Sequence, residues 1–207
     1  MRVLFVRHGE TDWNREMRIQ GGIVEIDINE RGVKQAEITR DGIVKAGFSF
    51  DRVFVSPYRR ARHTAEILSE PHGVEPVVDV RLHEITFGPY EGTQIRTFAD
   101  ENIRAAFKDP PRYVPRPGGE SFDEVETRLR SFLEEAILPL ETTAREVLVV
   151  AHGGILRTLT RLFDRRPLAE FWTADHQPNC CAHLLDCQDG NLSLVTRSLL
   201  FYDETRV

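Results

Sequence analysis

Residues 5–14 read FVRHGETDWN, and they continue an apolar run, VLFV, that spans residues 3–6. Four consecutive apolar residues between charged neighbours are typical of a short buried strand. The strand therefore runs directly into Arg7, His8 and Gly9. An arginine, a histidine and a glycine at the end of a buried strand suggest that this end faces a ligand.

A second strand is expected to end in the same way. Residues 147–150 read VLVV and are followed by Ala-His-Gly-Gly at 151–154. In parallel α/β sheets the ligand crevice lies beyond the carboxyl ends of the strands, where glycine lets the backbone approach a ligand closely. One histidine in a turn is ordinary, but two matched examples predict that His8 and His152 share a pocket.

Apolar runs and helical spacing alternate along the chain. The expected strands cover residues 2–6, 52–55, 76–78, 147–151, 182–186 and 192–196. Helices are expected after Asn29, after Ser56, and over residues 93–107, 121–137 and 155–163. This alternation predicts an α/β fold, a three-layer α/β/α sandwich with a mostly parallel central sheet.

Two of these helices have recognisable start signals. Asn29 is a candidate N-cap, and Ser56 is read as an N-cap with Pro57 at the first helical position. The segment 86–120 is different, because it holds five prolines and no clear strand. We interpret it as a lid or insertion within a single domain that spans residues 1–207.

Composition excludes several classes of function. The chain has 207 residues, 41% hydrophobic and 29% charged, with a formal net charge of -6. No overall basic field exists to hold nucleic acid or an anionic membrane surface, so neither is expected as a partner. No signal peptide or membrane span is apparent, which predicts a cytoplasmic protein. The three cysteines are clustered late in the sequence, and no disulfide is expected.

Arginines gather near the predicted pocket. Arg7 precedes His8, a cluster occupies residues 59–62, and Glu84 follows the third strand. Guanidinium groups bind phosphate oxygens bidentately, and amides of a first helical turn add donors. The ligand is therefore predicted to be a phosphate. Helical periodicity does not choose among Arg59, Arg60 and Arg62, and two of the three are expected on the surface.

The motifs together resemble the histidine phosphatase superfamily, which also contains the cofactor-dependent phosphoglycerate mutases. The matching segments are RHGETDWN (7–14), RIQG (18–21), SPYRRARHTAE (56–66), LHEITFGPYEG (82–92), PGGES (117–121) and AHGGILR (151–157). Six segments in the expected order span most of the chain. Residues 22–32, GIVEIDINERG, depart from the family pattern. The sequence therefore does not predict which residues form the pocket wall beside Gln20.

This resemblance implies a set of roles. His8 is the implied nucleophile, Glu84 the implied acid, and the remaining catalytic residues around the phosphoryl group are Arg7, Arg60 and His152. The implied substrate contacts are Asn14, Gln20, Gly21 and Gly153. The implied activity is hydrolysis of a small-molecule phosphomonoester through a phosphohistidine, without cofactor. The seven histidines show no zinc-ligand spacing, so no metal site is expected, and Trp13 and Trp172 are assigned no role.

Two alternative functions stay open. The first is a cofactor-dependent phosphoglycerate mutase, which resembles this chain but usually carries a tyrosine three residues after the acid, where Phe87 stands. That branch also uses a lysine soon afterwards, and no lysine lies between Lys45 and Lys108. The second is a non-catalytic phosphate-binding regulatory module. The sequence leaves open which phosphomonoester is the substrate and what the oligomeric state is.

Overall fold

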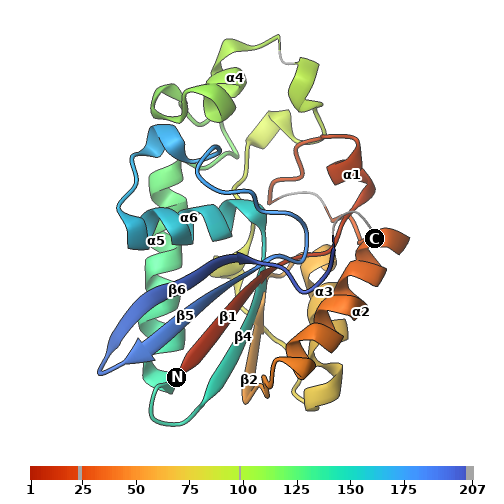
Figure 1. Cartoon of the computed structure of the whole chain (residues 1–207). Coiled ribbons are helices and arrows are strands. Elements are labelled where there is room, and N and C mark those ends of the chain that lie inside the picture. The colour runs from red at the N-terminus through yellow and green to blue at the C-terminus, as the bar shows by residue number, and fades with distance from the viewer. Residues whose placement is uncertain (23–24, 98, 204–207) are drawn as a thin grey trace.

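A six-stranded sheet runs through the centre of the protein in the order β3-β2-β4-β1-β5-β6 (Figure 1). The computed structural model describes residues 1–22, 25–97 and 99–203. The strands are β1 (Arg2–Arg7), β2 (Arg52–Val55), β3 (Val77–Val78), β4 (Glu146–Ala151), β5 (Ala182–Gln188) and β6 (Asn191–Leu199). The first four in this order, β3, β2, β4 and β1, are parallel, while β5 and β6 are antiparallel to their neighbours. The sheet is thus mostly parallel, as predicted.

The helices are α1 (Asp12–Arg15), α2 (Glu30–Lys45), α3 (Arg59–Ser69), α4 (Glu101–Lys108), α5 (Phe122–Phe132) and α6 (Gly153–Asp164). Both faces of the sheet are covered by helices. Figure 1 shows α2 and α3 on one side of the sheet and α5 and α6 on the other. The predicted three-layer α/β/α class is confirmed.

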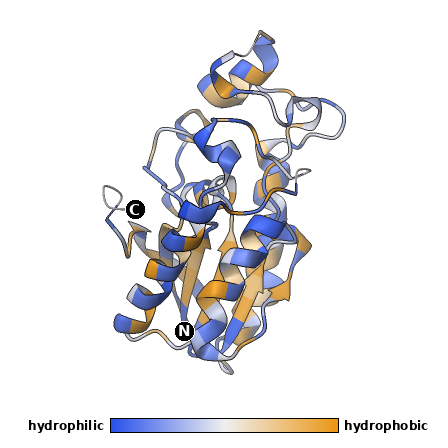
Figure 2. Cartoon of the chain, turned by 90° about the vertical axis from the view of Figure 1, so that its right-hand side faces the viewer, coloured by the Kyte–Doolittle hydropathy of each residue, from blue (hydrophilic) through white to orange (hydrophobic). Residues whose placement is uncertain are grey.

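The core forms on both sides of the central strands because side chains alternate along a strand. Val3 and Phe5 of β1 pack into the cluster that contains Phe132 of α5. Their neighbours Leu4 and Val6 pack into the opposite cluster, with residues of α2 and α3. In Figure 2 the strands in the middle of the protein carry mostly the hydrophobic colour. Continuous apolar runs such as 3–6 therefore fill two cores at once.

The register of the sheet brings three strand ends together. Arg7, the last residue of β1, pairs with Ala151, the last residue of β4. The ladder continues for one more bond, because the His8 amide donates to the Ala151 carbonyl at 3.0 Å. On the other side of β4 the Ser56 amide donates to the Val150 carbonyl at 3.0 Å. His8, His152 and Ser56 thus follow directly after three neighbouring strands.

One predicted helix start is wrong. Helix α3 begins at Arg59 with Tyr58 as its N-cap, and no side chain caps it. Ser56 still belongs to the sheet through its amide, and its hydroxyl bonds to His152 rather than to the helix. The N-cap expected at Asn29 is observed, since the Asn29 side chain accepts from the Gly32 amide. The structure adds a second cap at Ser121, whose side chain accepts from the Glu124 amide.

The helix expected over residues 93–107 is observed only from residue 101, so its predicted start is wrong. A short 3-10 turn at Ile95–Thr97 is followed by α4, which begins at Glu101. Asp100 accepts from the amides of Asn102 and Ile103, so it caps α4 and stops the helix from extending backwards. Residue 98 of the expected helix lies outside the described residues.

The segment 86–120 lies beyond the carboxyl ends of the central strands, where Figure 1 places α4. Its described residues add no strand to the sheet, and Phe87 and Gly119 form an isolated bridge within it. Its role as a lid stays a prediction. Within the part of the chain that the structure describes, no helix is long and apolar enough to cross a membrane.

The core packing generates a stability prediction. The Phe132 ring is fully buried and meets the rings of Phe5 and Phe54 edge-on, with centroids 6.3 and 5.5 Å away. Phe132→Ala should lower the free energy of unfolding by about 3–5 kcal/mol in urea titrations. Val44→Ala, at a residue 46% exposed on α2, should stay within about 0.5 kcal/mol of the parent. Equal effects of the two changes would show that Phe132 is not in the core.

Candidate active site

A cavity of about 120 Å³ opens beyond the end of β1. Seven of the nine predicted site residues line it: Arg7, His8, Asn14, Gln20, Gly21, Arg60 and Glu84. His152 lies beside His8, with ring centroids 5.2 Å apart. The predicted meeting of the two histidines is therefore observed. Gly153 is not among the lining residues, and its contact with substrate stays a prediction.

The His8 imidazole is held in one tautomer. Its Nδ1 lies 2.7 Å from the carbonyl oxygen of Gly9, which accepts only if Nδ1 carries the proton. The backbone is fixed as well, because the His8 carbonyl accepts from the Asn179 side chain at 3.0 Å. The lone pair of a neutral His8 therefore resides on Nε2, the atom that can act as a nucleophile.

His8 is uncharged near neutral pH. Its side chain is almost fully buried, and burial lowers its pKa well below the ordinary value, with further lowering from the Arg60 and Arg7 charges. Desolvation is the largest cause, since a buried imidazolium loses its hydration, and the two arginine charges add to it.

His152 is fully buried and is oriented by Ser56. Its Nε2 lies 2.6 Å from the Ser56 hydroxyl, which itself accepts from the Tyr58 amide at 3.4 Å. A hydroxyl that accepts from an amide can donate to Nε2, and this places the His152 proton on Nδ1. That buried Nδ1 has no acceptor among the described residues. Burial and the Arg60 charge lower the pKa of His152 well below its usual value.

Arg60 is the buried member of the arginine cluster. Its side chain is 0% exposed, while Arg59 and Arg62 lie on the surface, as expected for two of the three. Its Nη2 donates to the Gly21 carbonyl at 2.8 Å. Burial lowers the pKa of Arg60 to about 10, so the guanidinium remains charged at neutral pH.

Arg7 approaches from the other side of His8. Its Nη1 donates to the Gln177 carbonyl, and its buried Nε has no acceptor in the described part of the chain. A buried polar atom without a partner costs roughly 1–3 kcal/mol. Arg7 Nε and His152 Nδ1 would both be satisfied by the oxygens of an anion, which fits a phosphoryl group. A Cβ on Gly153 would lie 3.4 Å from Arg7 Nε, so this glycine leaves room for the guanidinium.

Glu84 is held against the first turn of α6. Its Oε2 accepts from the Gly154 amide at 3.0 Å, and its Oε1 accepts from the Ile85 amide at 2.9 Å. A Cβ on Gly154 would collide with Glu84 Oε1, so only glycine admits the carboxylate at this place.

Asn14 and Gln20 present donors to the cavity. The Thr11 hydroxyl donates to Gln20 Oε1 at 2.7 Å, and the Thr11 amide donates to Asn14 Oδ1 at 3.2 Å. With both amide oxygens engaged, the –NH₂ groups are the parts left to donate to a ligand, which suits an oxyanion.

The structure identifies residues that the sequence reasoning missed. Ser56 was read as a helix cap, yet it orients His152. The Glu91 carboxylate is partly buried and packs against Gly21, where a Cβ would collide with it. Burial raises the pKa of Glu91 to about 7. Its acidic neighbour Glu84 raises the pKa further, while the Phe87 amide and the Arg60 charge oppose the rise. Trp172, which was given no role, lines the cavity. Ser56 and Glu91 lie within the matched segments 56–66 and 82–92, and this was the available signal.

The unusual segment after Gly21 lies partly outside the described residues, which omit positions 23 and 24. Asp27, within its described part, forms ion pairs with Arg59 Nε at 2.9 Å and with His63 Nδ1 at 2.9 Å. Asp27 thus contacts the surface side of α3 and is not among the cavity-lining residues.

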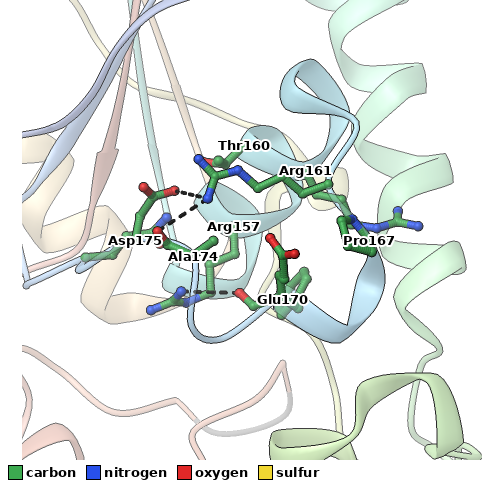
Figure 3. Close-up of a pocket in the computed structure, with 10 residues that line it drawn as sticks. Arg157, Thr160, Arg161, Pro167, Glu170, Ala174 and Asp175 are labelled. Carbon is green, nitrogen blue, oxygen red and sulfur yellow. Dashed lines mark hydrogen bonds and ion pairs between the residues drawn. The ribbon is translucent and has the colours of Figure 1, made fainter.

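A second cavity is too small to hold a substrate. It lies near the end of α6, where Figure 3 shows Arg157 and Asp175 on its wall. Its volume is about 10 Å³, roughly the room for one water molecule. Within residues 1–22, 25–97 and 99–203, no group of three or more His, Cys, Asp or Glu side chains could hold a metal ion.

The lowered pKa of His8 can be measured directly. At about pH 6.5, where a free histidine is half protonated, His8 should be neutral with its proton on Nδ1 in ¹⁵N NMR spectra of the imidazole. The unfolded state then binds more protons than the native state, so the free energy of unfolding should decrease as pH falls below about 6.5. The urea-unfolded chain is the control. A His8 imidazolium in the folded protein at this pH would contradict the electrostatic account.

Sequence comparisons place the chain among known enzymes. The family model of the histidine phosphatase superfamily (branch 1) matches residues 3–199. A relative from Hydrogenobacter thermophilus, provisionally named phosphoserine phosphatase 2, is 33% identical over 173 residues, covering 83% of this chain and 82% of the relative. A 2,3-bisphosphoglycerate-dependent phosphoglycerate mutase from Rhizobium rhizogenes is 30% identical over 173 residues, with 79% of each chain covered.

Solved structures agree with the sequence comparisons. The alpha-ribazole phosphatase from Shigella flexneri matches with a TM-score of 0.81 at 26% identity, covering 96% of both chains. YhfR from Bacillus stearothermophilus matches with a TM-score of 0.81 at 27% identity, covering 93% of this chain and 94% of that one. The chain therefore belongs to the histidine phosphatase superfamily (branch 1), whose members are phosphatases or mutases.

Proposed function

We propose that the protein is a phosphomonoester hydrolase that works through a phosphohistidine at His8. One observation carries this proposal: a buried, neutral His8 presents Nε2 in a cavity that two arginines also line. A neutral imidazole is a competent nucleophile toward phosphorus. Arg7, Arg60 and the Nδ1–H of His152 are donors for the three phosphoryl oxygens.

The first step transfers the phosphoryl group to the protein. The Nε2 lone pair of His8 attacks phosphorus, the P–N bond forms, and the ester P–O bond breaks. The leaving alkoxide takes a proton from Glu84, the carboxyl group that lines the same cavity. The hydrogen bond from Nδ1–H to the Gly9 carbonyl stabilises the positive charge that His8 gains.

The second step regenerates the histidine. Water attacks phosphorus, the P–N bond breaks, and the Glu84 carboxylate accepts a proton from the water. Inorganic phosphate leaves, and His8 is neutral again. The fixed charges of Arg7 and Arg60 offset the charge on the phosphoryl oxygens in both transition states, so we expect turnover without a divalent ion.

A mutase is the second candidate, because the relatives include phosphoglycerate mutases at 30% identity or just below. Such an enzyme would return the phosphoryl group to the substrate instead of to water. Phe87 stands where that branch usually carries tyrosine, and no lysine is found among the described residues that line the cavity. Both features favour hydrolysis.

Replacement of the nucleophile tests the proposal. His8→Ala should reduce hydrolysis of p-nitrophenyl phosphate to below about one thousandth of the parent rate, because the covalent route is lost. The parent should keep its rate in EDTA. His176→Ala, at an exposed histidine, is the matched control. Full activity of His8→Ala would refute the mechanism, and so would an EDTA-sensitive parent that a divalent ion restores. Phosphate affinity without any turnover would support the non-catalytic module.

The role of Glu84 predicts a dependence on the leaving group. Glu84→Gln should lower kcat/KM for alkyl phosphates by roughly 100-fold or more, but should lower kcat/KM for p-nitrophenyl phosphate much less, because p-nitrophenolate leaves without a proton and kcat/KM does not include the later attack of water on the phosphohistidine. Glu37→Gln, at an exposed glutamate on α2, is the matched control. Equal losses on both substrate types for Glu84→Gln would remove it as the acid.

Product analysis separates hydrolase from mutase. The protein is supplied with 3-phosphoglycerate and a trace of 2,3-bisphosphoglycerate. We expect inorganic phosphate to accumulate. Accumulation of 2-phosphoglycerate faster than phosphate would establish the mutase instead.

A further inference from the structure

We propose that the outer part of the cavity selects phosphomonoesters whose alcohol carries an aromatic or similarly bulky apolar group, in preference to alcohols that carry a carboxylate. This inference rests on the proposed function and names its substrate class. It starts from the lining residues that the phosphate chemistry does not use. Among these are the apolar side chains of Ile85, Phe87, Ile95, Phe107 and Trp172.

The aromatic part of this wall is pre-built. The rings of Phe107 and Trp172 stack with centroids 4.9 Å apart and an interplanar angle of 27°. The Phe87 ring lies 5.2 Å from that of Phe107. The Trp172 indole N–H donates to the Ala106 carbonyl at 2.7 Å, so its one polar atom is already satisfied within the wall. What the tryptophan can offer a ligand is therefore its apolar ring surface.

The same part of the cavity offers little to a carboxylate. Beyond the two arginines assigned to the phosphoryl group, Arg18 is the one cation among the described lining residues. Arg18 Nε already binds the Glu16 carboxylate at 2.6 Å, and its Nη1 donates to the Gly92 carbonyl at 2.9 Å. A substrate carboxylate would therefore compete with Glu16 for this guanidinium.

The energetic comparison favours the apolar group. An aromatic ring that leaves water and enters contact with this wall gains from burial and from ring stacking. A carboxylate in the same place loses hydration and finds no unengaged cation among the described lining residues. Differences of this kind in a pocket amount to roughly 10- to 200-fold in kcat/KM.

The test uses two primary alkyl esters, 2-phenylethyl phosphate and O-phosphoserine, so that the scissile bond is of the same type. We expect kcat/KM to be at least about 10-fold higher for the phenylethyl ester. Binding of the two matching phosphonates, 2-phenylethylphosphonate and 2-amino-3-phosphonopropionate, is measured in parallel by calorimetry. Since phosphonates are not hydrolysed, their binding reports on selectivity even if no ester is turned over.

Two substitutions assign the selectivity to the wall. Phe107→Ala should lower kcat/KM for the phenylethyl ester by roughly 10-fold and leave phosphoserine nearly unchanged. Ile95→Lys adds a cation at a residue that is 36% exposed and should raise kcat/KM for phosphoserine relative to the phenylethyl ester. Ile38→Lys, at a residue 39% exposed on α2, is the matched control and should leave the ratio unchanged. Circular dichroism checks that each variant is folded. If Phe107→Ala does not fold, the kcat/KM ratio of Ile95→Lys tests the selectivity by itself.

The outcomes separate the two proposals. Absence of hydrolysis with selective phosphonate binding would sink the proposed function and keep the apolar selectivity. Equal or tighter binding of the carboxylate-bearing phosphonate, together with a kcat/KM ratio at or below one, would overturn the inference while leaving hydrolysis intact. Variants at Ile95 and Phe107 that fail to change the ratio would also overturn it.

Discussion

The pairing of β1 with β4 is the constraint on which the site depends. Because Arg7 and Ala151 are paired at the ends of β1 and β4, the residues that follow the two strands begin at the same edge of the sheet. The His8 amide then extends the ladder to the Ala151 carbonyl, and the two imidazoles lie with centroids 5.2 Å apart. A slip of one residue would turn every side chain of β1 to the other face and separate the histidines. The hydrophobic core thus sets the catalytic geometry.

Burial governs the electrostatics of this geometry. Desolvation is the largest cause of the lowered pKa values of His8, His152 and Arg60. For the histidines this favours the neutral forms that the proposed mechanism requires, in His8 as nucleophile and in His152 as hydrogen-bond donor. For Arg60 it leaves a charged group with little hydration to lose when an anion arrives. The site is therefore organised for a phosphoryl group before the substrate binds.

Sequence patterns predicted most strands and the meeting of the two histidines, because apolar runs and parallel-sheet geometry are local and general. They were wrong where a side chain had a choice of partners. Ser56 bonds to His152 instead of capping a helix, and Asp100 caps α4 where periodicity predicted a continuous helix. Periodicity could not choose Arg60, since only packing decides which arginine is buried. The wall of Phe87, Phe107 and Trp172 joins three distant segments, so no single motif predicts it.

The central claim is that His8 carries the phosphoryl group during turnover, and trapping that group tests it most directly. The protein is quenched in alkali during turnover of a ³²P-labelled phosphomonoester, and the labelled peptide is sequenced by mass spectrometry. The account predicts acid-labile phosphate on Nε2 of His8. Label on another residue, or rapid turnover with no label on the protein at any quench time, would contradict it.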